Sequence, residues 1–251
     1  MDSGLYAAYT GLLARTQALD IAANNLANAG TNGFRAQRDY FSGILTGSLD
    51  QDPATASQVG QSVNGFGVLG GNMLDLGQGQ LATTGNPLDL ALQGQGFFAI
   101  QTAIGIRYTR DGTFTRSSTG VLQTSHGEPV LDSNQKSITI PTGEVHISGD
   151  GTISVATPAG SAIVGQVGVF DFTDKTALTA EGINRFTADG VNPVAANAAI
   201  EQGAVEGANQ DAVHGTMQMV LVQRQAEMMQ KALSVFNTDF DKTAAEDLPR
   251  V

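Results

Sequence analysis

Residues 93–100 read Gln93-Gly94-Gln95-Gly96-Phe97-Phe98-Ala99-Ile100, and four apolar residues directly follow two glycines that alternate with glutamines. A short apolar run after a glycine turn is typical of a core β-strand. The glycine-rich part lacks the Lys and Ser/Thr residues that a phosphate-binding loop needs. We therefore interpret it as a tight turn before a strand, and this stretch places β structure at the centre of the chain.

Further strand signals recur after this run at a spacing of roughly 8–12 residues. Residues 106–109 and 113–115 flank Asp111-Gly112, a pair that favours a hairpin turn, so we predict a hairpin there. Gly149-Asp150-Gly151 predicts another turn. Other strand candidates are residues 120–123, 129–131, 137–140, 144–147, 152–155 and 162–172. This part shows no alternation of helix and strand, which excludes a doubly wound fold and favours an all-β sandwich or irregular barrel.

The two chain ends carry apolar residues at heptad spacing, which indicates helices with an apolar stripe. The stripe residues are Leu5, Leu12, Leu19 and Leu26 at one end, and Leu221, Met228 and Val235 at the other. We predict helices over about residues 3–28 and 209–243. Each stripe must be covered, so the predicted fold class is α+β: long N- and C-terminal helices that pack together in a coiled-coil-like bundle, with an inserted all-β domain.

Three domains follow from this pattern. Residues 1–30 and 207–245 form a discontinuous terminal helical domain, residues 31–85 an extended connector with short strands, and residues 86–206 the β domain. The N-terminal helix is unusual because residues 1–34 contain three charged residues. A two-stranded coiled coil in water would carry charges beside its stripe. We therefore expect this helix to pack among several neighbours.

Composition excludes several classes of protein and site. The net charge of −11 argues against nucleic-acid binding, which needs clustered Lys and Arg. The absence of cysteine excludes disulfides and zinc–thiolate sites. No apolar run is long enough for direct membrane insertion, and the N-terminus has no pattern of a secretory signal peptide. The three histidines lie far apart in the sequence. We expect no catalytic residue, no metal site and no cofactor.

Three groups of residues lie at the start, in the middle and at the end of the chain: Asn24-Asn25-Leu26-Ala27-Asn28 with Thr31-Asn32-Gly33-Phe34-Arg35; Gln93-Gly94-Gln95-Gly96-Phe97-Phe98 with Tyr108-Thr109-Arg110-Asp111-Gly112; and Gln202-Gly203-Ala204-Val205-Glu206 with Gln223-Arg224. In this order they resemble the signatures of bacterial flagellar rod and hook proteins. The resemblance spans nearly the whole chain. Within it the chain is most similar to the basal-body rod proteins, and we favour the proximal-rod type, with the distal-rod type as the alternative.

The resemblance implies a structural subunit that stacks helically in the periplasmic rod of the flagellar basal body and transmits torque from motor to hook. It implies as partners other rod subunits, further copies of the chain and the flagellar type III export apparatus, with export that needs no cleaved signal peptide. A second hypothesis is a secreted β-rich enzyme or carbohydrate-binding module that forms dimers through its terminal helices. The absence of tryptophan, which such modules use to stack on sugars, speaks against it.

The expected assembly interface combines the stripe residues with the amides and the exit turn at the end of the first helix. Amides three or four residues apart lie on adjacent turns and can bond neighbouring backbone. Glycine permits a sharp exit from the helix, and the phenylalanine after it could fill a pocket of a neighbour. The predicted interface residues are Leu5, Leu12, Leu19, Asn24, Asn25, Leu26, Asn28, Gly33, Phe34, Leu221, Met228 and Val235. We also hypothesise that both terminal helices are largely unfolded in the monomer and become ordered when subunits assemble.

Overall fold

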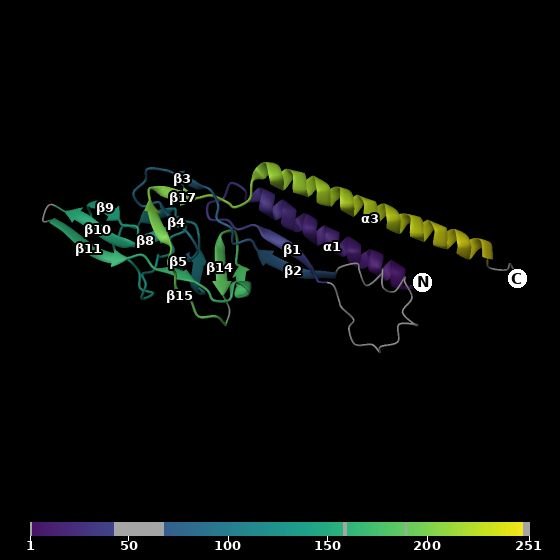
Figure 1. Cartoon of the computed structure of the whole chain (residues 1–251), viewed down its shortest axis with the longest axis horizontal. Helices are drawn as coiled ribbons and strands as arrows, with labels where there is room; N and C mark the ends of the chain where they lie inside the picture. The colour runs from purple at the N-terminus through teal and green to yellow at the C-terminus, as the bar shows by residue number, and fades with distance from the viewer. Residues whose placement is uncertain (1, 43–67, 158–159, 189, 248–251) are drawn as a thin grey trace. The chain divides into compact units, whose positions relative to one another are not determined.

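A computed structural model describes residues 2–42, 68–157, 160–188 and 190–247 (Figure 1). The chain divides into two compact units. The helical unit comprises Met1–Leu26, Gln37–Met73 and Val213–Val251, and the β unit comprises Ala27–Ala36 and Leu74–Ala212. The chain therefore crosses from one unit to the other at residues 26/27, 36/37, 73/74 and 212/213.

The helical unit contains two long helices, α1 (Asp2–Ala27) and α3 (Ala212–Asp247), and a small two-stranded sheet of β1 (Gln37–Ser42) and β2 (Val68–Leu74). The helices run antiparallel to each other (Figure 1). They approach closely at Gly11, where an added methyl group would lie 3.1 Å from Cε of Met229. Neither helix combines the length and the hydropathy that a membrane span requires.

Small side chains form the buried face of α1. Ala14, Ala18 and Ala22 are each at most 5% exposed. At 100° per residue these alanines and Gly11 fall within about 80° of the helix circumference. The leucines Leu12, Leu19 and Leu26 lie roughly 100° away around the helix and are half-buried. The face of α1 that packs inside the chain is therefore the alanine face.

The predicted coiled-coil-like bundle of long helices is wrong. In the part of the chain that the structure describes there are two α-helices, which make a pair, and a much larger β-rich part. Leu12, Leu19 and Leu26 of the α1 heptad lie on a different face from the buried alanines. Alanine and glycine allow two helix backbones to come closer than leucines would, so this pair does not need the leucine stripe. The predicted β domain is present.

Short strands build the β unit, and one 3-10 turn, η1 (Lys175–Ala177), interrupts them. The strands are β3 (Leu81–Thr83), β4 (Leu90–Gln93), β5 (Phe97–Thr102), β6 (Gly105–Thr109), β7 (Phe114–Arg116), β8 (Leu122–Thr124), β9 (Glu144–Ile147), β10 (Thr152–Thr157), β11 (Gly160–Gln166), β12 (Val169–Asp171), β13 (Leu178–Ala180), β14 (Arg185–Ala188), β15 (Val194–Ala195), β16 (Ala199–Gln202) and β17 (Ala204–Glu206). Six of them form a sheet in the order β13-β14-β6-β5-β12-β15, and three form a second sheet, β11-β10-β9. The pairs β16-β4, β17-β3 and β7-β8 complete the unit.

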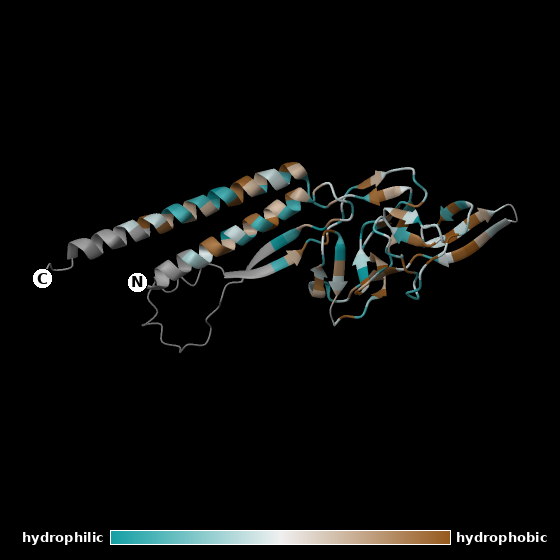
Figure 2. Cartoon of the chain, turned by 180° about the vertical axis from the view of Figure 1, so that it is seen from behind, coloured by the Kyte–Doolittle hydropathy of each residue, from teal (hydrophilic) through white to brown (hydrophobic). Residues whose placement is uncertain are grey.

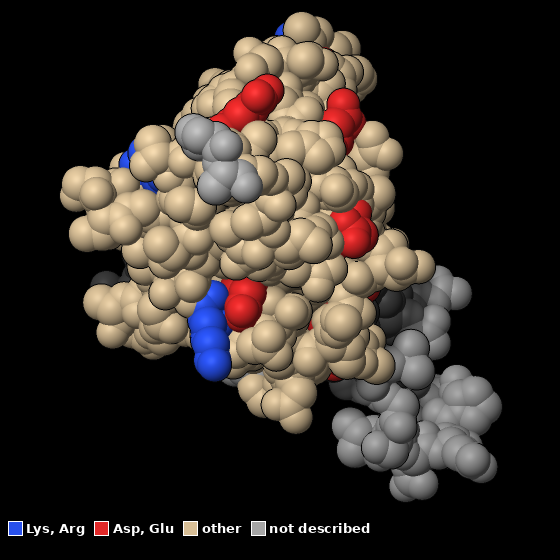
Figure 3. All heavy atoms as spheres, turned by 90° about the vertical axis from the view of Figure 1, so that its left-hand side faces the viewer, with Lys and Arg blue, Asp and Glu red and all other residues tan. Residues whose placement is uncertain are grey.

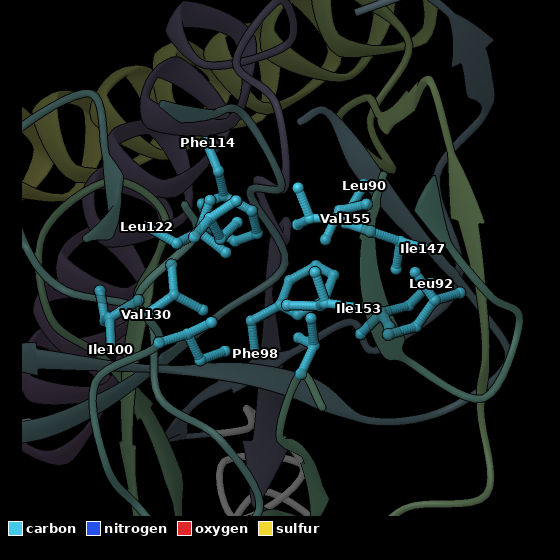
Figure 4. Close-up of a cluster of buried hydrophobic side chains, with 14 residues drawn as sticks. Leu90, Leu92, Phe98, Ile100, Phe114, Leu122, Val130, Ile147, Ile153 and Val155 are labelled. Atoms are coloured by element: carbon cyan, nitrogen blue, oxygen red, sulfur yellow. The ribbon is translucent and has the colours of Figure 1, made fainter. Parts of the chain in front are cut away.

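Strand β5 separates two apolar cores. Phe98 and Ile100 pack into the first core (Figure 4), whereas Phe97 and Ala99 pack into the second. Successive side chains of a strand point to opposite faces, so a strand with a core on each side must be apolar at every position. The sequence-based interpretation of this stretch as a core strand after a tight turn is confirmed.

The predicted hairpin at Asp111-Gly112 is wrong. β6 pairs with β5 and β14, whereas β7 pairs with β8, so the two strands on either side of this turn belong to different sheets. Gly112 lies against β4, where an added Cβ would be 1.6 Å from the carbonyl oxygen of Leu90. Here the turn residues let the chain change sheets at a close backbone contact. The predicted turn at Gly149-Asp150-Gly151 is confirmed, since β9 and β10 pair antiparallel across it.

Candidate functional site

The inner face of α3 follows a regular pattern of buried and half-buried residues. Their spacing alternates between four and three residues, which keeps them on one side of the helix. They are Gly215, Met219, Val222, Ala226, Met229 and Leu233. Met229 lies next to Gly11 of α1. This face is therefore the one that α3 uses within its own chain.

A second apolar stripe, which we call the outer stripe, lies on the opposite side of α3. It consists of Val213, Met217, Val220, Leu221, Met228 and Val235, which are all between 48% and 67% exposed. Apolar residues recur along the coloured part of the helix in Figure 2. An amphipathic helix packs one apolar face against its own chain, so this second set of exposed apolar residues is available for contact with a neighbour. The outer stripe contains all three predicted interface residues of this helix.

The predicted leucines of α1 whose side chains the structure describes are less exposed than the predicted residues of α3. Leu12, Leu19 and Leu26 are half-buried, and the side chain of Leu5 lies outside the described residues. Tyr9 and Leu13, which the heptad pattern does not include, are 55% and 59% exposed. The exposed apolar surface of α1 thus differs from the predicted stripe.

The three predicted asparagines have different environments. Asn25 is buried, and its amide makes both possible bonds to the backbone of Gln37: Nδ2 donates to the carbonyl oxygen at 2.8 Å, and Oδ1 accepts from the N–H at 2.9 Å. This pair of bonds fastens the first residue of β1 to the last turns of α1. Asn24 is exposed. The carbonyl of Asn28 accepts from the N–H of Thr31 at 3.0 Å, in the turn after the helix.

Gly33 and Phe34 are both buried in the β unit. Gly33 has φ +69°, and an added Cβ would lie 2.2 Å from the backbone nitrogen of Asp111, so only glycine fits this position. Its N–H donates to the carbonyl oxygen of Glu206 at 2.7 Å. Phe34 is 3% exposed. These two residues contribute to the packing of their own chain, and little of the Phe34 ring is left for a neighbour.

The three stretches that carry the family resemblance meet at one buried ionic cluster, which we call the latch: Arg35, Arg110 and Glu206. Nη2 of Arg35 donates to Oε1 of Glu206 at 2.6 Å, and Nη1 of Arg110 donates to Oε2 at 3.0 Å. The side chains are at most 4% exposed. The N–H of Gly79 also donates to Oε1, at 2.7 Å. The carboxylate thus joins segments that lie up to 171 residues apart in the sequence.

The latch holds two cations and one anion in a buried position. Burial lowers the pKa of the Arg110 guanidinium, and the nearby Glu206 carboxylate opposes that change. Nη2 of Arg110 donates to the carbonyl oxygen of Gly94 at 2.5 Å, and its guanidinium carbon lies 5.5 Å from the centre of the Phe97 ring. Removing one partner of such a buried pair costs about 3–5 kcal/mol, because a charge is left buried and uncompensated.

Asn209 adds a second set of bonds beside the latch. Its Oδ1 accepts from the N–H of Ala36 at 2.7 Å, while Nδ2 donates to the carbonyl oxygens of Asp75 at 2.7 Å and Gly77 at 3.1 Å. Its backbone N–H donates to the carbonyl oxygen of Phe34 at 3.3 Å. Together with the latch, Asn209 ties three segments of the chain to one another inside the β unit.

Sequence reasoning missed the latch, although all three residues lie within the stretches that it singled out. The available signal was the chemistry of those stretches. Two of them contain the arginines Arg35 and Arg110 and the third contains Glu206, in a chain in which charged residues make up only 15%. The sequence does not show which of these charges are buried or which of them pair.

A groove of about 950 Å³ in the β unit is one candidate for a ligand site. Its lining includes Pro87, Leu88, His146 and Gln202 but no Phe, Tyr or Trp, so it offers sugars no ring to stack on. Among the described residues no group of three His, Asp or Glu side chains is placed to hold a metal ion. On the face that Figure 3 shows, basic side chains are few and scattered. The geometry favours the outer stripe and the latch as the functional features.

Comparisons with known proteins point to one family. Residues 5–35 match the family model described as flagella basal body rod protein, and residues 91–155 match that of the flagellar hook protein FlgE/F/G D1 domain. The flagellar basal-body rod protein FlgF of Caulobacter vibrioides is 35% identical over 188 residues, which are 74% of this chain and 73% of that protein.

Two further relatives agree with this match. FlgG of Bacillus subtilis is 33% identical over 194 residues, with 74% of this chain and 73% of that protein covered. FlgF of Salmonella typhimurium is 39% identical over 158 residues, with 61% and 58% covered. Both are flagellar basal-body rod proteins by name. The chain belongs to the family of flagellar basal-body rod proteins.

Proposed function

We propose that this chain polymerises through its terminal helices in the flagellar basal-body rod and carries torque from the motor to the hook. Its family makes it a structural rod protein of the flagellar basal body and not an enzyme. The observation that carries the proposal is the outer stripe of α3, whose six apolar residues are all about half exposed or more. The dimerised enzyme or sugar-binding module is not favoured.

The outer stripe supports assembly by a simple energetic argument. Apolar surface gains about 25 cal/mol for every Å² that is removed from water, and the inner face of α3 already packs within the chain. A stripe that the chain itself leaves uncovered can be covered by a neighbour. When the neighbour's matching surface is a different one, the contact repeats from subunit to subunit, and it produces a helical filament where the rotation does not close into a ring. The partners that we propose are other rod subunits and further copies of this chain.

Lysine substitutions in the outer stripe test this proposal. The double substitution Leu221→Lys and Met228→Lys places two charges on surface that is exposed in the single chain, so the purified variant should keep its fold. In a strain that lacks the wild-type chain, the variant should fail to enter the rod, because a contact would have to bury the charges. Gln218→Lys, at an exposed polar position of the same helix, is the matched control and should assemble normally. Normal rods built from the double variant would contradict the proposal.

We also propose that the export apparatus exports the chain without cleaving a signal peptide. Mass spectrometry of the chain from isolated basal bodies tests this. An N-terminus at Met1 or Asp2 is expected, and one at Ser3 or any later residue of α1 would contradict it.

The proximal-rod type stays our proposal for the position of this chain. Relatives of the FlgF and FlgG kinds are similarly identical to it, at 35% and 33%. Imaging basal bodies from a strain without the chain decides between the types. A rod that stops near its motor end supports the proximal type, and a rod that lacks its far end contradicts it.

A further inference from the structure

At three of the four chain crossings between the units, the latch or Asn209 holds the segment on the β-unit side of the crossing. Arg35 and Ala36 directly precede the crossing at 36/37, and Asp75 follows the crossing at 73/74 by two residues. Glu206 and Asn209 precede the crossing at 212/213. Any force that passes along the covalent chain from the β unit has to leave it through segments such as these.

The held segments bond to one another as well as to Glu206 and Asn209. The N–H of Asp75 donates to the carbonyl oxygen of Ala36 at 2.8 Å, and the N–H of Gly207 donates to that of Gln80 at 2.9 Å. Through Arg110, whose guanidinium lies over the ring of Phe97 in the second apolar core, the same cluster reaches the link between β6 and β7. A pull on one segment is therefore shared by several bonds that act in parallel.

The chemistry of these bonds suits them to resist displacement. Hydrophobic contacts are non-directional, so packed apolar surfaces can shift past each other. Charge-assisted hydrogen bonds to a guanidinium are about twice as strong as neutral ones and fix a direction. In the latch they are also sealed from water, with side chains that are at most 4% exposed, so neither solvent nor salt competes for the partners.

We infer that the latch is the joint through which mechanical load enters the β unit, with Glu206 as its central positioning residue. This inference rests on the proposed torque-bearing role. The latch holds the ends of three segments so that load on them reaches the β unit as a whole and does not peel the segments away one by one. In this account the outer stripe joins subunits, whereas the latch keeps the crossing segments bonded to the rest of the β unit under load.

The first test is amide hydrogen exchange of the purified chain with Glu206→Gln, which keeps the shape of the side chain and removes its charge. The amides of Gly33, Ala36 and Gly79 should exchange about a hundredfold faster or more, while those of β5 and β6 keep their protection. Glu181→Gln is the matched control, because it breaks a partly exposed Arg–Glu pair with Arg107 at 2.7 Å in the same unit. An equal rise throughout the β unit, or no rise at the three amides, would overturn the inference.

The second test measures swimming under load in cells that carry the variant as their only copy. Glu206→Gln cells should build rods and swim normally in dilute medium, but lose a larger share of their speed in viscous medium than Glu181→Gln cells. Equal speeds at every viscosity would overturn the inference, and so would failure of the variant to enter the rod, since that would make the latch an assembly element. Neither result bears on the outer-stripe substitutions, which test the proposed function separately.

Discussion

At the scale of single residues, Gly33 has a backbone conformation and a close contact that only glycine allows. The sequence predicted part of this, since a glycine after an asparagine-rich helix end suggests a sharp exit. It did not predict the contact with Asp111, because the two residues lie far apart in the sequence. The latch shows the same limit: its residues were within the quoted motifs, but their pairing depends on a fold that brings distant segments together.

Gly33→Ala should destabilise the β unit by more than about 2 kcal/mol, because a left-handed conformation costs an alanine about 1–2 kcal/mol and the Asp111 backbone must also move. Gly85→Ala is the control, since Gly85 has a similar φ of +77° but nothing within 4 Å of its added Cβ. Urea unfolding of the two variants separates the cost of the left-handed conformation from the cost of moving the Asp111 backbone. Equal losses of stability would show that the contact at Asp111 does not matter.

Asp150, in the turn between β9 and β10, has a lowered pKa because its carboxylate accepts hydrogen bonds from the hydroxyl and the N–H of Thr152. A carboxyl group with a lowered pKa in the folded chain stabilises the fold above its ordinary pKa of 3.8, and that contribution is lost as the pH falls through the lowered value. Thr152→Val should therefore raise the Asp150 pKa towards 3.8. NMR titration of the carboxyl carbon measures it, and an unchanged pKa in the variant would contradict this account.

At the scale of elements, the sequence predicted the two terminal helices and most strands, because their signals are local: heptad spacing, short β-branched runs and glycine turns. The sequence-based predictions were wrong where the outcome depended on which strand or helix face an element packs against. The Asp111-Gly112 pair has the chemistry of a hairpin turn, yet the neighbouring strands find their partners elsewhere. The leucines of α1 have the spacing of a packing stripe, yet small residues on another face make the contact within the chain.

Ala18→Leu should destabilise the helix pair by about 1–3 kcal/mol, because the larger side chain has no room on the buried face of α1. Ala23→Leu makes the same change at an exposed position of the same helix and should leave the stability nearly unchanged. Thermal unfolding followed by circular dichroism at 222 nm compares the two. If both variants melted together with the wild type, the alanine face would not be a packed interface.

At the scale of the whole molecule, the chain combines a β unit with two cores of its own and a helical unit whose longer helix leaves an apolar stripe exposed. Helices at both ends and a β domain between them were predicted from the sequence, but the predicted coiled-coil-like bundle of these helices is wrong. A single sequence does not show which apolar stripes are covered within one chain and which are left for neighbours. The structure shows this difference on α3, where Val222 and Met229 lie on the inner face and Leu221 and Met228 lie on the exposed outer face.

The central claim is that neighbours cover the outer stripe when the rod assembles. The chain has no cysteine, so Met228→Cys introduces a single thiol on the stripe, and Ile104→Cys introduces one at a position of the β unit that is 69% exposed. The most direct measurement is the rate of maleimide labelling of each thiol in the free chain and in isolated basal bodies. We predict that Cys labelling at position 228 is fast in the free chain and strongly slowed in the basal body, while labelling at position 104 reports how far the reagent reaches the β unit. Equally fast labelling at position 228 in both states would contradict the claim.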